Sequence, residues 1–203
     1  AAGEGGMITT NNYSLYKSLL RLRSHGINKL DDDFINKSQS ETEGINNPWY
    51  YEMQDLGFNF RITDIQCALG LSQLQKLDRF IVRRRKLVEK YDKSFKEFNN
   101  LKPAQYNGRE ISSHHLYVIR INYDKIKYTR ASLMKKLKDY GILCQVHYIP
   151  VTSQPYYSSK GYNSEDYPVS LKFYNQTLSI PLYYSLKDDD QEKVIKVFKS
   201  LVG

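Results

Sequence analysis

The residues best suited to chemistry in this sequence gather in four short segments, each at the end of a predicted helix or strand. Functional sites are usually built from such ends, and glycines there allow backbone conformations that other residues rarely adopt. Arg61 lies near a predicted helix start, where a cation is mildly unfavourable, so it is either a simple surface cation or the neighbour of a separate anionic partner. The segments are residues 3–6 (GEGG), 23–26 (RSHG), 57–61 (GFNFR) and 145–150 (QVHYIP).

Other common kinds of catalytic site lack their sequence patterns here. The four histidines and two cysteines show no paired-ligand spacing, so we expect no structural zinc site. His114 and His115 would point to opposite faces of a strand. Residues 3–6 lack the Lys-Ser/Thr pair of a phosphate-binding P-loop. The nucleophile elbow of a hydrolase, G-x-S-x-G, is absent, although a catalytic triad assembled from distant residues stays open.

Composition places the chain among globular proteins of a reducing compartment. Its 203 residues suffice for one ample domain, or for one domain and part of another. The sequence contains no apolar run of the roughly 18 residues that a membrane span needs, and no signal peptide. Cys67 and Cys144 lie in apolar surroundings, as buried thiols do, and we expect a cytoplasmic protein. The glycine-rich start, without an initiator methionine, is typical of the middle of a larger protein.

The net charge of +8 could steer a polyanion or an anionic metabolite towards the protein. Positive residues are nevertheless dispersed except at residues 83–86 (RRRK), which we predict to form a solvated helix face. Neither an aromatic RNA-binding strand nor zinc spacing accompanies the charge, so we do not expect nucleic-acid binding.

In the N-terminal part of the chain, two helices are predicted from their start signals. After a short strand at residues 7–10, Asn12 or Ser14 can cap a helix that ends at Gly26. Residues 28–53 are polar and aperiodic, which predicts a long loop. At Thr63 a capping box opens a second helix, and a long amphipathic helix with apolar residues from 80 to 95 follows. These last two helices together are typical of a connector between two domains.

The C-terminal half alternates strands and helices, which predicts an α/β or α+β lobe with helices covering one face of a sheet. The tyrosines expected in the core are Tyr16, Tyr91, Tyr117 and Tyr140. We predict strands at residues 115–121 and 143–147, an extended segment at 178–181, helices at 130–140, 169–176 and 188–202, and a Tyr- and Pro-rich loop at 148–168.

Five stretches carry a resemblance to a known family. They are residues 3–6 (GEGG), 23–27 (RSHGI), 57–74 (GFNFRITDIQCALGLSQL), 145–151 (QVHYIPV) and 178–182 (LSIPL). In this order and at these separations, they resemble the C-terminal half of the sugar aminotransferases of the DegT/DnrJ/EryC1/StrS family, which use pyridoxal phosphate. The resemblance covers the whole chain. Within the family, the chain is most similar to the branch of pseudaminic acid biosynthesis that aminates UDP-4-keto-6-deoxy-N-acetyl-β-L-altrosamine.

This resemblance implies the α/β fold of fold-type I pyridoxal-phosphate-dependent transferases, like that of aspartate aminotransferase. Residues 1–77 would form the end of the cofactor-binding large domain, residues 78–100 a connecting helix, and residues 101–203 an α+β small domain. The enzyme would be a homodimer with both active sites at its interface. It would transfer an amino group from L-glutamate to C4 of the UDP-linked 4-keto sugar, leaving 2-oxoglutarate.

The resemblance also assigns roles to individual residues. The family's cofactor lysine would fall three positions before Ala1, so no catalytic residue is expected in this sequence. Asn59, by local rules only a turn former, would reach the cofactor phosphate held by the neighbouring subunit. Apart from the resemblance, Arg61 is expected to contact a substrate phosphate or the donor carboxylate if it lies in the site, because a guanidinium can bind either through two hydrogen bonds. The sugar nucleotide would be bound by Gln145, Val146, His147 and Tyr148.

Three alternatives stay open. A split or degraded gene would leave a non-catalytic fragment that acts at most as a binding or dimerisation module. Some relatives replace the lysine and perform dehydration at C3, and the lysine position lies outside this sequence. A basic polyanion-binding domain would instead show salt-sensitive binding to unrelated nucleic acids.

Overall fold

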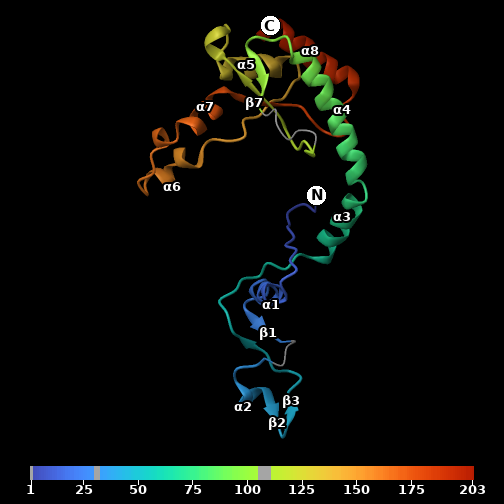
Figure 1. The fold of residues 1–203 in the computed structure, drawn as a ribbon, viewed down its shortest axis with the longest axis vertical. Helices are drawn as coiled ribbons and strands as arrows, with labels where there is room; N and C mark the ends of the chain where they lie inside the picture. The colour runs from blue at the N-terminus through green and yellow to red at the C-terminus, as the bar shows by residue number, and fades with distance from the viewer. Residues whose placement is uncertain (1, 30–32, 105–110) are drawn as a thin grey trace. The chain divides into compact units, whose positions relative to one another are not determined.

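The computed structural model describes residues 2–29, 33–104 and 111–203, which fall into two compact units (Figure 1). The N-terminal unit ends at Lys76, and the C-terminal unit runs from Leu77 to Gly203. Within the described residues, each helix is too short or too polar to cross a membrane.

The first helix of the N-terminal unit, α1 (Tyr13–Leu22), begins at one of the two predicted caps. The side chain of Asn12 accepts a hydrogen bond from the backbone N–H of Leu15 at 3.0 Å, so Asn12 rather than Ser14 caps the helix. Gly26 follows the helix with a φ of 70°, a left-handed conformation that glycine adopts without strain.

The strand predicted at residues 7–10 is wrong. Within the described chain these residues pair with no strand, and Met7 and Ile8 are 89% and 71% exposed. A strand needs a partner for its backbone hydrogen bonds. The apolar composition of residues 7–10 does not show whether such a partner exists.

The described residues of the predicted loop at 28–53 are more ordered than a loop. The turn at Glu43 and Gly44, both with positive φ, is the two-residue type that joins antiparallel strands. Strands of two residues carry no hydrophobic alternation, so the sequence pattern could not predict them. The elements are β1 (Ile27–Asn28) paired with β4 (Glu52–Met53), α2 (Lys37–Ser40), and β2 (Glu41–Thr42) paired with β3 (Ile45–Asn46).

The carboxylate of Glu52 ties this segment together. It accepts hydrogen bonds from the side-chain amide of Gln54, from the backbone N–H groups of Ile35 and Asn36, and from the hydroxyl of Tyr50. These bonds favour the ionised carboxylate and lower the pKa of Glu52 to about 2. The segment is therefore held by a charged acceptor at neutral pH.

The capping box predicted at Thr63 is confirmed at the start of α3 (Asp64–Leu74). The hydroxyl of Thr63 accepts from the Gln66 backbone N–H at 3.3 Å, and the Gln66 side-chain oxygen accepts from the Thr63 N–H at 3.1 Å. Two backbone donors at the helix start are satisfied in this way.

A three-stranded antiparallel sheet with the order β5-β6-β7 organises the C-terminal unit. Along the middle strand, Tyr117, Ile119 and Ile121 are buried and alternate with half-buried residues, so one face of the sheet lies on the core. The strand predicted at residues 115–121 and the extended segment at 178–181 are confirmed. The strands are β5 (Leu101–Pro103), β6 (Tyr117–Ile121) and β7 (Thr177–Ile180).

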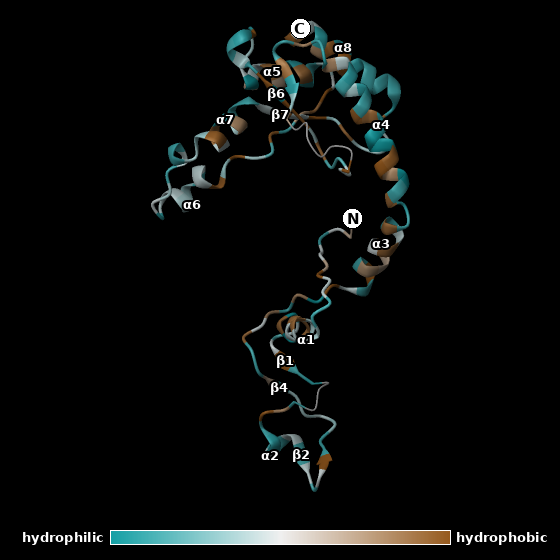
Figure 2. Ribbon diagram, in the orientation of Figure 1, coloured by the Kyte–Doolittle hydropathy of each residue, from teal (hydrophilic) through white to brown (hydrophobic). Residues whose placement is uncertain are grey.

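Three helices bury their apolar side chains in the same core as this face of the sheet. Figure 2 shows the hydrophilic and hydrophobic bands along one of them, α4, as the amphipathic sequence predicts. Another helix, α7 (Pro168–Gln176), contacts β6. The helices predicted at residues 130–140, 169–176 and 188–202 are confirmed. The core helices are α4 (Leu77–Phe95), α5 (Arg130–Asp139) and α8 (Asp188–Val202).

The predicted loop at residues 148–168 contains one helix, α6, and short helical turns. They are α6 (Pro155–Ser158) and the 3-10 turns Val151–Ser153 and Ser164–Asp166; a further 3-10 turn, Tyr123–Lys125, follows β6.

The short strand predicted at residues 143–147 is wrong. It reduces to a single antiparallel bridge, in which Gln145 and Ser179 exchange backbone hydrogen bonds of 2.8 and 3.1 Å. Beyond His147 the chain leaves the sheet and enters the turn at Val151–Ser153, so the ladder does not continue.

Two of the four tyrosines predicted for the core are buried. Tyr91 and Tyr117 are at most 2% exposed, whereas Tyr16 and Tyr140 are 48% and 46% exposed. The Tyr117 hydroxyl donates to the carboxylate of Asp92 at 2.7 Å, which satisfies a polar group that would otherwise be costly to bury.

Cys67 and Cys144 are unpaired, belong to different units and are half-buried rather than fully buried. Burial raises the pKa of the Cys144 thiol to about 12. The raised pKa favours the protonated thiol at neutral pH, and the thiolate is the reactive form of cysteine.

Of residues 83–86, predicted to form a solvated face, only Lys86 is exposed, whereas the three arginines are half-buried. Nη1 of Arg84 donates to the backbone carbonyls of His114, His115 and Leu182 at 3.0–3.2 Å. Backbone carbonyl groups outside helices and strands need hydrogen-bond donors. The fold decides which carbonyls lie near Arg84, so the local sequence cannot show that they bind it. The two neighbouring arginines also bind backbone carbonyls, Arg83 that of Leu186 and Arg85 that of Ser112.

Replacing Arg84 by methionine is expected to destabilise the C-terminal unit by about 2 kcal/mol, because hydrogen bonds from a charged donor contribute about 1.5–3 kcal/mol. Exposed Lys86 on the same helix gives the control Lys86→Met, with a change below about 0.5 kcal/mol. Hydrogen–deuterium exchange of peptides spanning residues 111–118 measures the effect. Equal exchange rates in the two variants would contradict a holding role for Arg84.

Candidate functional site

Two of the segments predicted to be functional lie side by side in the N-terminal unit. The N–H of Phe58 donates to the carbonyl of Leu22 at 3.2 Å, and the carbonyl of Phe58 accepts from the N–H of His25 at 2.9 Å. Ser24 and Asn59 form an antiparallel bridge between them. The two segments therefore have a fixed register, although neither forms a regular strand.

Two glycines permit this close approach. A Cβ atom at Gly57 would lie 2.3 Å from the backbone nitrogen of Gly26, and a Cβ at Gly26 would lie 1.7 Å from the carbonyl oxygen of Asp55. No larger residue fits at either position without moving a backbone. The conformational role that the sequence indicates for these glycines is thus to bring two backbones into contact.

Residues 3–6 join the same unit through Gln66. While the side-chain oxygen of Gln66 completes the capping box, its Nε2 donates to the carbonyl of Glu4 at 2.8 Å. A Cβ at Gly5 would lie 3.1 Å from Cδ1 of Ile62. Three of the four predicted segments therefore lie in the N-terminal unit.

Asn59 is exposed, and the oxygen of its side-chain amide takes part in a hydrogen bond. Its Oδ1 accepts from the backbone N–H of Arg61 at 3.2 Å. Among the described residues, its Nδ2 has no hydrogen-bond partner. An amide nitrogen with two unused N–H groups suits an oxygen of a phosphate or of another anion.

Arg61 is held beside Asn59 by Ser24, whose hydroxyl accepts from Nη1 of Arg61 at 2.7 Å. Both segments border a hollow of about 730 Å³, and no carboxylate is among the described residues that line it. Lys17 and Arg21 pair with Asp33 and Asp55 outside this lining. An anionic ligand would meet a positive surface here. The charged or basic residues that line the hollow are Lys17, Arg21, Arg23, His25, Lys29 and Arg61.

The fourth predicted segment lies in the C-terminal unit beside β7. Gln145 is bridged to Ser179, and its side-chain oxygen accepts from the N–H of Val146 at 2.9 Å. Nδ1 of His147 lies 2.8 Å from the hydroxyl of Ser179. The ring of Tyr148, which is 73% exposed, lies edge-on to that of His147 with 4.6 Å between the centroids. Sequence reasoning missed Ser179, although the stretch at residues 178–182 contains it.

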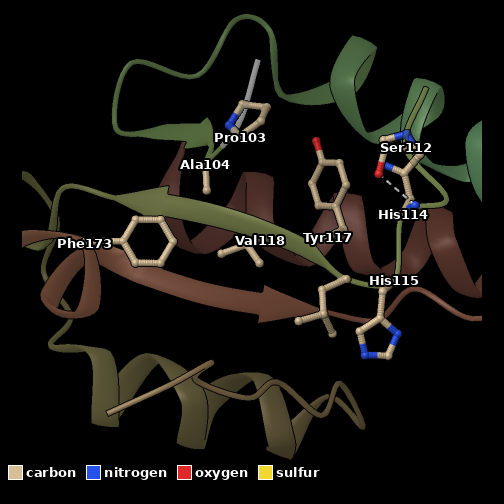
Figure 3. Close-up of a pocket in the computed structure, with 9 residues that line it drawn as sticks. Pro103, Ala104, Ser112, His114, His115, Tyr117, Val118 and Phe173 are labelled. Atoms are coloured by element: carbon tan, nitrogen blue, oxygen red, sulfur yellow. Dashed lines mark hydrogen bonds between the residues drawn. The ribbon is translucent and has the colours of Figure 1, made fainter. Parts of the chain in front are cut away.

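A separate pocket of about 340 Å³ lies at the start of β6 (Figure 3). Phe173 and Val118 line it together with His115, and none of the predicted site residues does. The N–H of His114 donates to the Ser112 hydroxyl at 3.0 Å, and φ of His114 is 50°. These histidines precede the strand rather than lie on it. In the described part of the chain, no cluster of three His, Cys, Asp or Glu side chains could hold a metal ion.

Comparison with known proteins identifies the family. The model of the DegT/DnrJ/EryC1/StrS aminotransferase family matches residues 1–199. The chain belongs to this family. The spore coat polysaccharide biosynthesis protein SpsC of Bacillus subtilis is 36% identical over 204 residues, which cover 100% of this chain and 50% of SpsC. The UDP-4-amino-4,6-dideoxy-N-acetyl-beta-L-altrosamine transaminase of Helicobacter pylori is 31% identical, over 97% of this chain and 49% of its own length.

Solved structures of sugar aminotransferases have the same fold. PseC of Helicobacter pylori, an aminotransferase involved in the biosynthesis of pseudoaminic acid, matches with a TM-score of 0.72 and 27% identity, over 95% of this chain and 48% of PseC. The PLP form of Spr1654 from Streptococcus pneumoniae, a proposed sugar aminotransferase, matches with a TM-score of 0.77 and 26% identity, over 94% and 44% of the two chains. This DegT-family chain therefore has the mixed α/β fold of fold-type I enzymes, and pyridoxal phosphate is the family's cofactor.

The chain spans about half the length of the curated relatives it matches. The residues present fit a phosphate-bearing cofactor in one respect: the unused Nδ2 of Asn59 lies on the same segment as Arg61, which lines the basic hollow.

Replacing Gly57 by alanine is expected to cost about 1–3 kcal/mol, because the new Cβ would force two backbones apart. Amide exchange at residues 58–60 should become faster. Gly6→Ala is the control, since a Cβ there meets nothing within 4 Å. If the two variants exchanged alike at residues 58–60, the close approach would not hold the segments together.

Proposed function

We propose that the full-length protein transfers an amino group from L-glutamate to C4 of a UDP-linked 4-keto-6-deoxy-N-acetyl-hexosamine, of the pseudaminic acid type, leaving 2-oxoglutarate. The observation that carries the proposal is the pairing of residues 22–25 with 57–61, which holds Asn59 beside Arg61 at the edge of a basic hollow. Such a surface suits phosphate-bearing ligands. The 31% sequence identity to the altrosamine transaminase of Helicobacter pylori supports the choice of sugar.

In this proposal Asn59 holds the phosphate of pyridoxal phosphate bound to the neighbouring subunit of a homodimer. A neutral amide donates to a phosphate oxygen without adding a charge to the site. Bound pyridoxal phosphate supplies an electron sink for amino transfer. Arg61 binds a sugar-nucleotide phosphate or the donor carboxylate through the N–H groups that Ser24 does not use.

The sugar nucleotide binds to the segment beside β7 through backbone groups and polar side chains. His147 and Tyr148 offer an imidazole and a phenol hydroxyl, which hydrogen-bond hydroxyl, acetamido or phosphate groups. We assign residues 1–77 to the cofactor-binding domain, 78–100 to a connecting segment whose helix α4 ends at Phe95, and 101–203 to the small domain, and we place the reaction in the cytoplasm. The segment consists of Gln145, Val146, His147 and Tyr148.

The test of the substrate uses the full-length protein with L-glutamate and two keto sugars, UDP-linked in the altro or the gluco configuration. We expect faster amination of the altro sugar. Equal turnover, or preference for the gluco sugar, would contradict the pseudaminic assignment. A product that has lost its C3 hydroxyl would instead identify a dehydratase.

Replacing Asn59 by alanine is expected to raise the apparent dissociation constant of pyridoxal phosphate about tenfold, since a hydrogen bond to a charged group contributes about 1.5–3 kcal/mol and 1.4 kcal/mol is tenfold. A cofactor titration of the full-length enzyme measures this constant. Asn11→Ala, at an exposed position of the same unit, should leave it unchanged. An unchanged constant in the Asn59 variant would remove Asn59 from the cofactor site.

A further inference from the structure

Ser179 contacts the segment that we assign to substrate binding. It lies on β7, is 5% exposed, and exchanges both of its backbone hydrogen bonds with Gln145. Side chains two residues apart on an extended chain point the same way. His147 is therefore placed over Ser179, and its Nδ1 lies 2.8 Å from the serine hydroxyl.

The burial of Ser179 favours one direction of this hydrogen bond. A neutral imidazole has one donor and one acceptor nitrogen, and a hydroxyl can serve either. If Nδ1–H donated to the serine, the buried hydroxyl proton would need another acceptor, and the described residues offer Ser179 none besides His147. A buried donor without a partner is costly. A hydroxyl that donates to Nδ1, with the ring proton on Nε2, avoids this cost.

We propose that Ser179 is a positioning residue that holds His147 as the Nε2–H tautomer, so that His147 donates a hydrogen bond to an oxygen of the sugar nucleotide. The second half of this proposal rests on the proposed function, because it takes residues 145–148 as the substrate-binding segment. Within the described residues, Nε2 of His147 has no hydrogen-bond partner. A keto, hydroxyl or phosphate oxygen accepts from such a donor, whereas the other tautomer would accept from donors.

The chain offers a matched control on the same strand. Thr177 is buried two residues before Ser179, and its hydroxyl has no hydrogen-bond partner in the described structure. Thr177→Val removes a buried hydroxyl of β7 and keeps the shape of the side chain. Ser179→Ala removes the hydroxyl that contacts His147, and Ser179→Thr keeps it.

The first measurement is the tautomer of His147, read from the ring nitrogen chemical shifts of the full-length protein labelled with ¹⁵N-histidine. His147→Gln identifies the signal. We expect the Nε2–H form in the native protein, Thr177→Val and Ser179→Thr, and a mixture of both forms in Ser179→Ala. An Nδ1–H form in the native protein, or an unchanged signal in Ser179→Ala, would overturn the positioning role. This readout does not depend on activity.

The second measurement separates this inference from the proposed function. We expect Ser179→Ala to raise KM for the UDP-keto sugar about tenfold, with the glutamate half-reaction unchanged, and Thr177→Val to leave both unchanged. If the tautomer changes in Ser179→Ala but KM for the sugar does not, His147 does not contact the sugar, and the substrate-binding assignment of residues 145–148 fails with the second half of the inference. Equal losses in both half-reactions would show a structural defect and overturn the sugar contact.

Discussion

The contact between two backbones at Gly26 and Gly57 is the constraint on which the N-terminal unit depends. Backbone atoms, which no rotamer change can move aside, occupy the space where side chains would otherwise be. Asn59 and Arg61 take their positions from this contact, because one bridges to Ser24 and the other donates to its hydroxyl. Neither residue has a regular strand or helix to hold it.

The C-terminal unit positions its polar segment in a different way. Here a buried sheet comes first, and residues 145–148 attach to its edge by one bridge and one side-chain hydrogen bond. The arginines of α4 fasten other irregular segments through their carbonyls. Helix propensity has little part in holding either group of segments. The rigid elements supply donors and acceptors, and the candidate segments attach to them.

The sequence predicted those elements whose cause is local. The capping box at Thr63 and the helix after Lys187 each depend on residues within a few positions of one another, and they form as predicted. The strands expected at residues 7–10 and 143–147 fail because strand formation requires a partner elsewhere in the chain. The prediction that the arginines at residues 83–85 are solvated fails because their acceptors lie about 30 or 100 residues away in the sequence. The candidate segments stand out by residue type, whereas the hydrogen bonds that pair two of them and the contact between His147 and Ser179 required coordinates.

The two ends of the Gln66 side chain perform different tasks: its oxygen closes the capping box at Thr63, and its nitrogen holds Glu4. Glutamate would serve the helix start equally well, yet it would bring a second acceptor to the Glu4 carbonyl. Deamidation of Gln66 would therefore leave the capping box of α3 intact while it removes the hydrogen bond to the Glu4 carbonyl. Capping-box statistics favour glutamate and glutamine equally at the position of Gln66. The contact with Glu4 favours the amide, and those statistics do not include it.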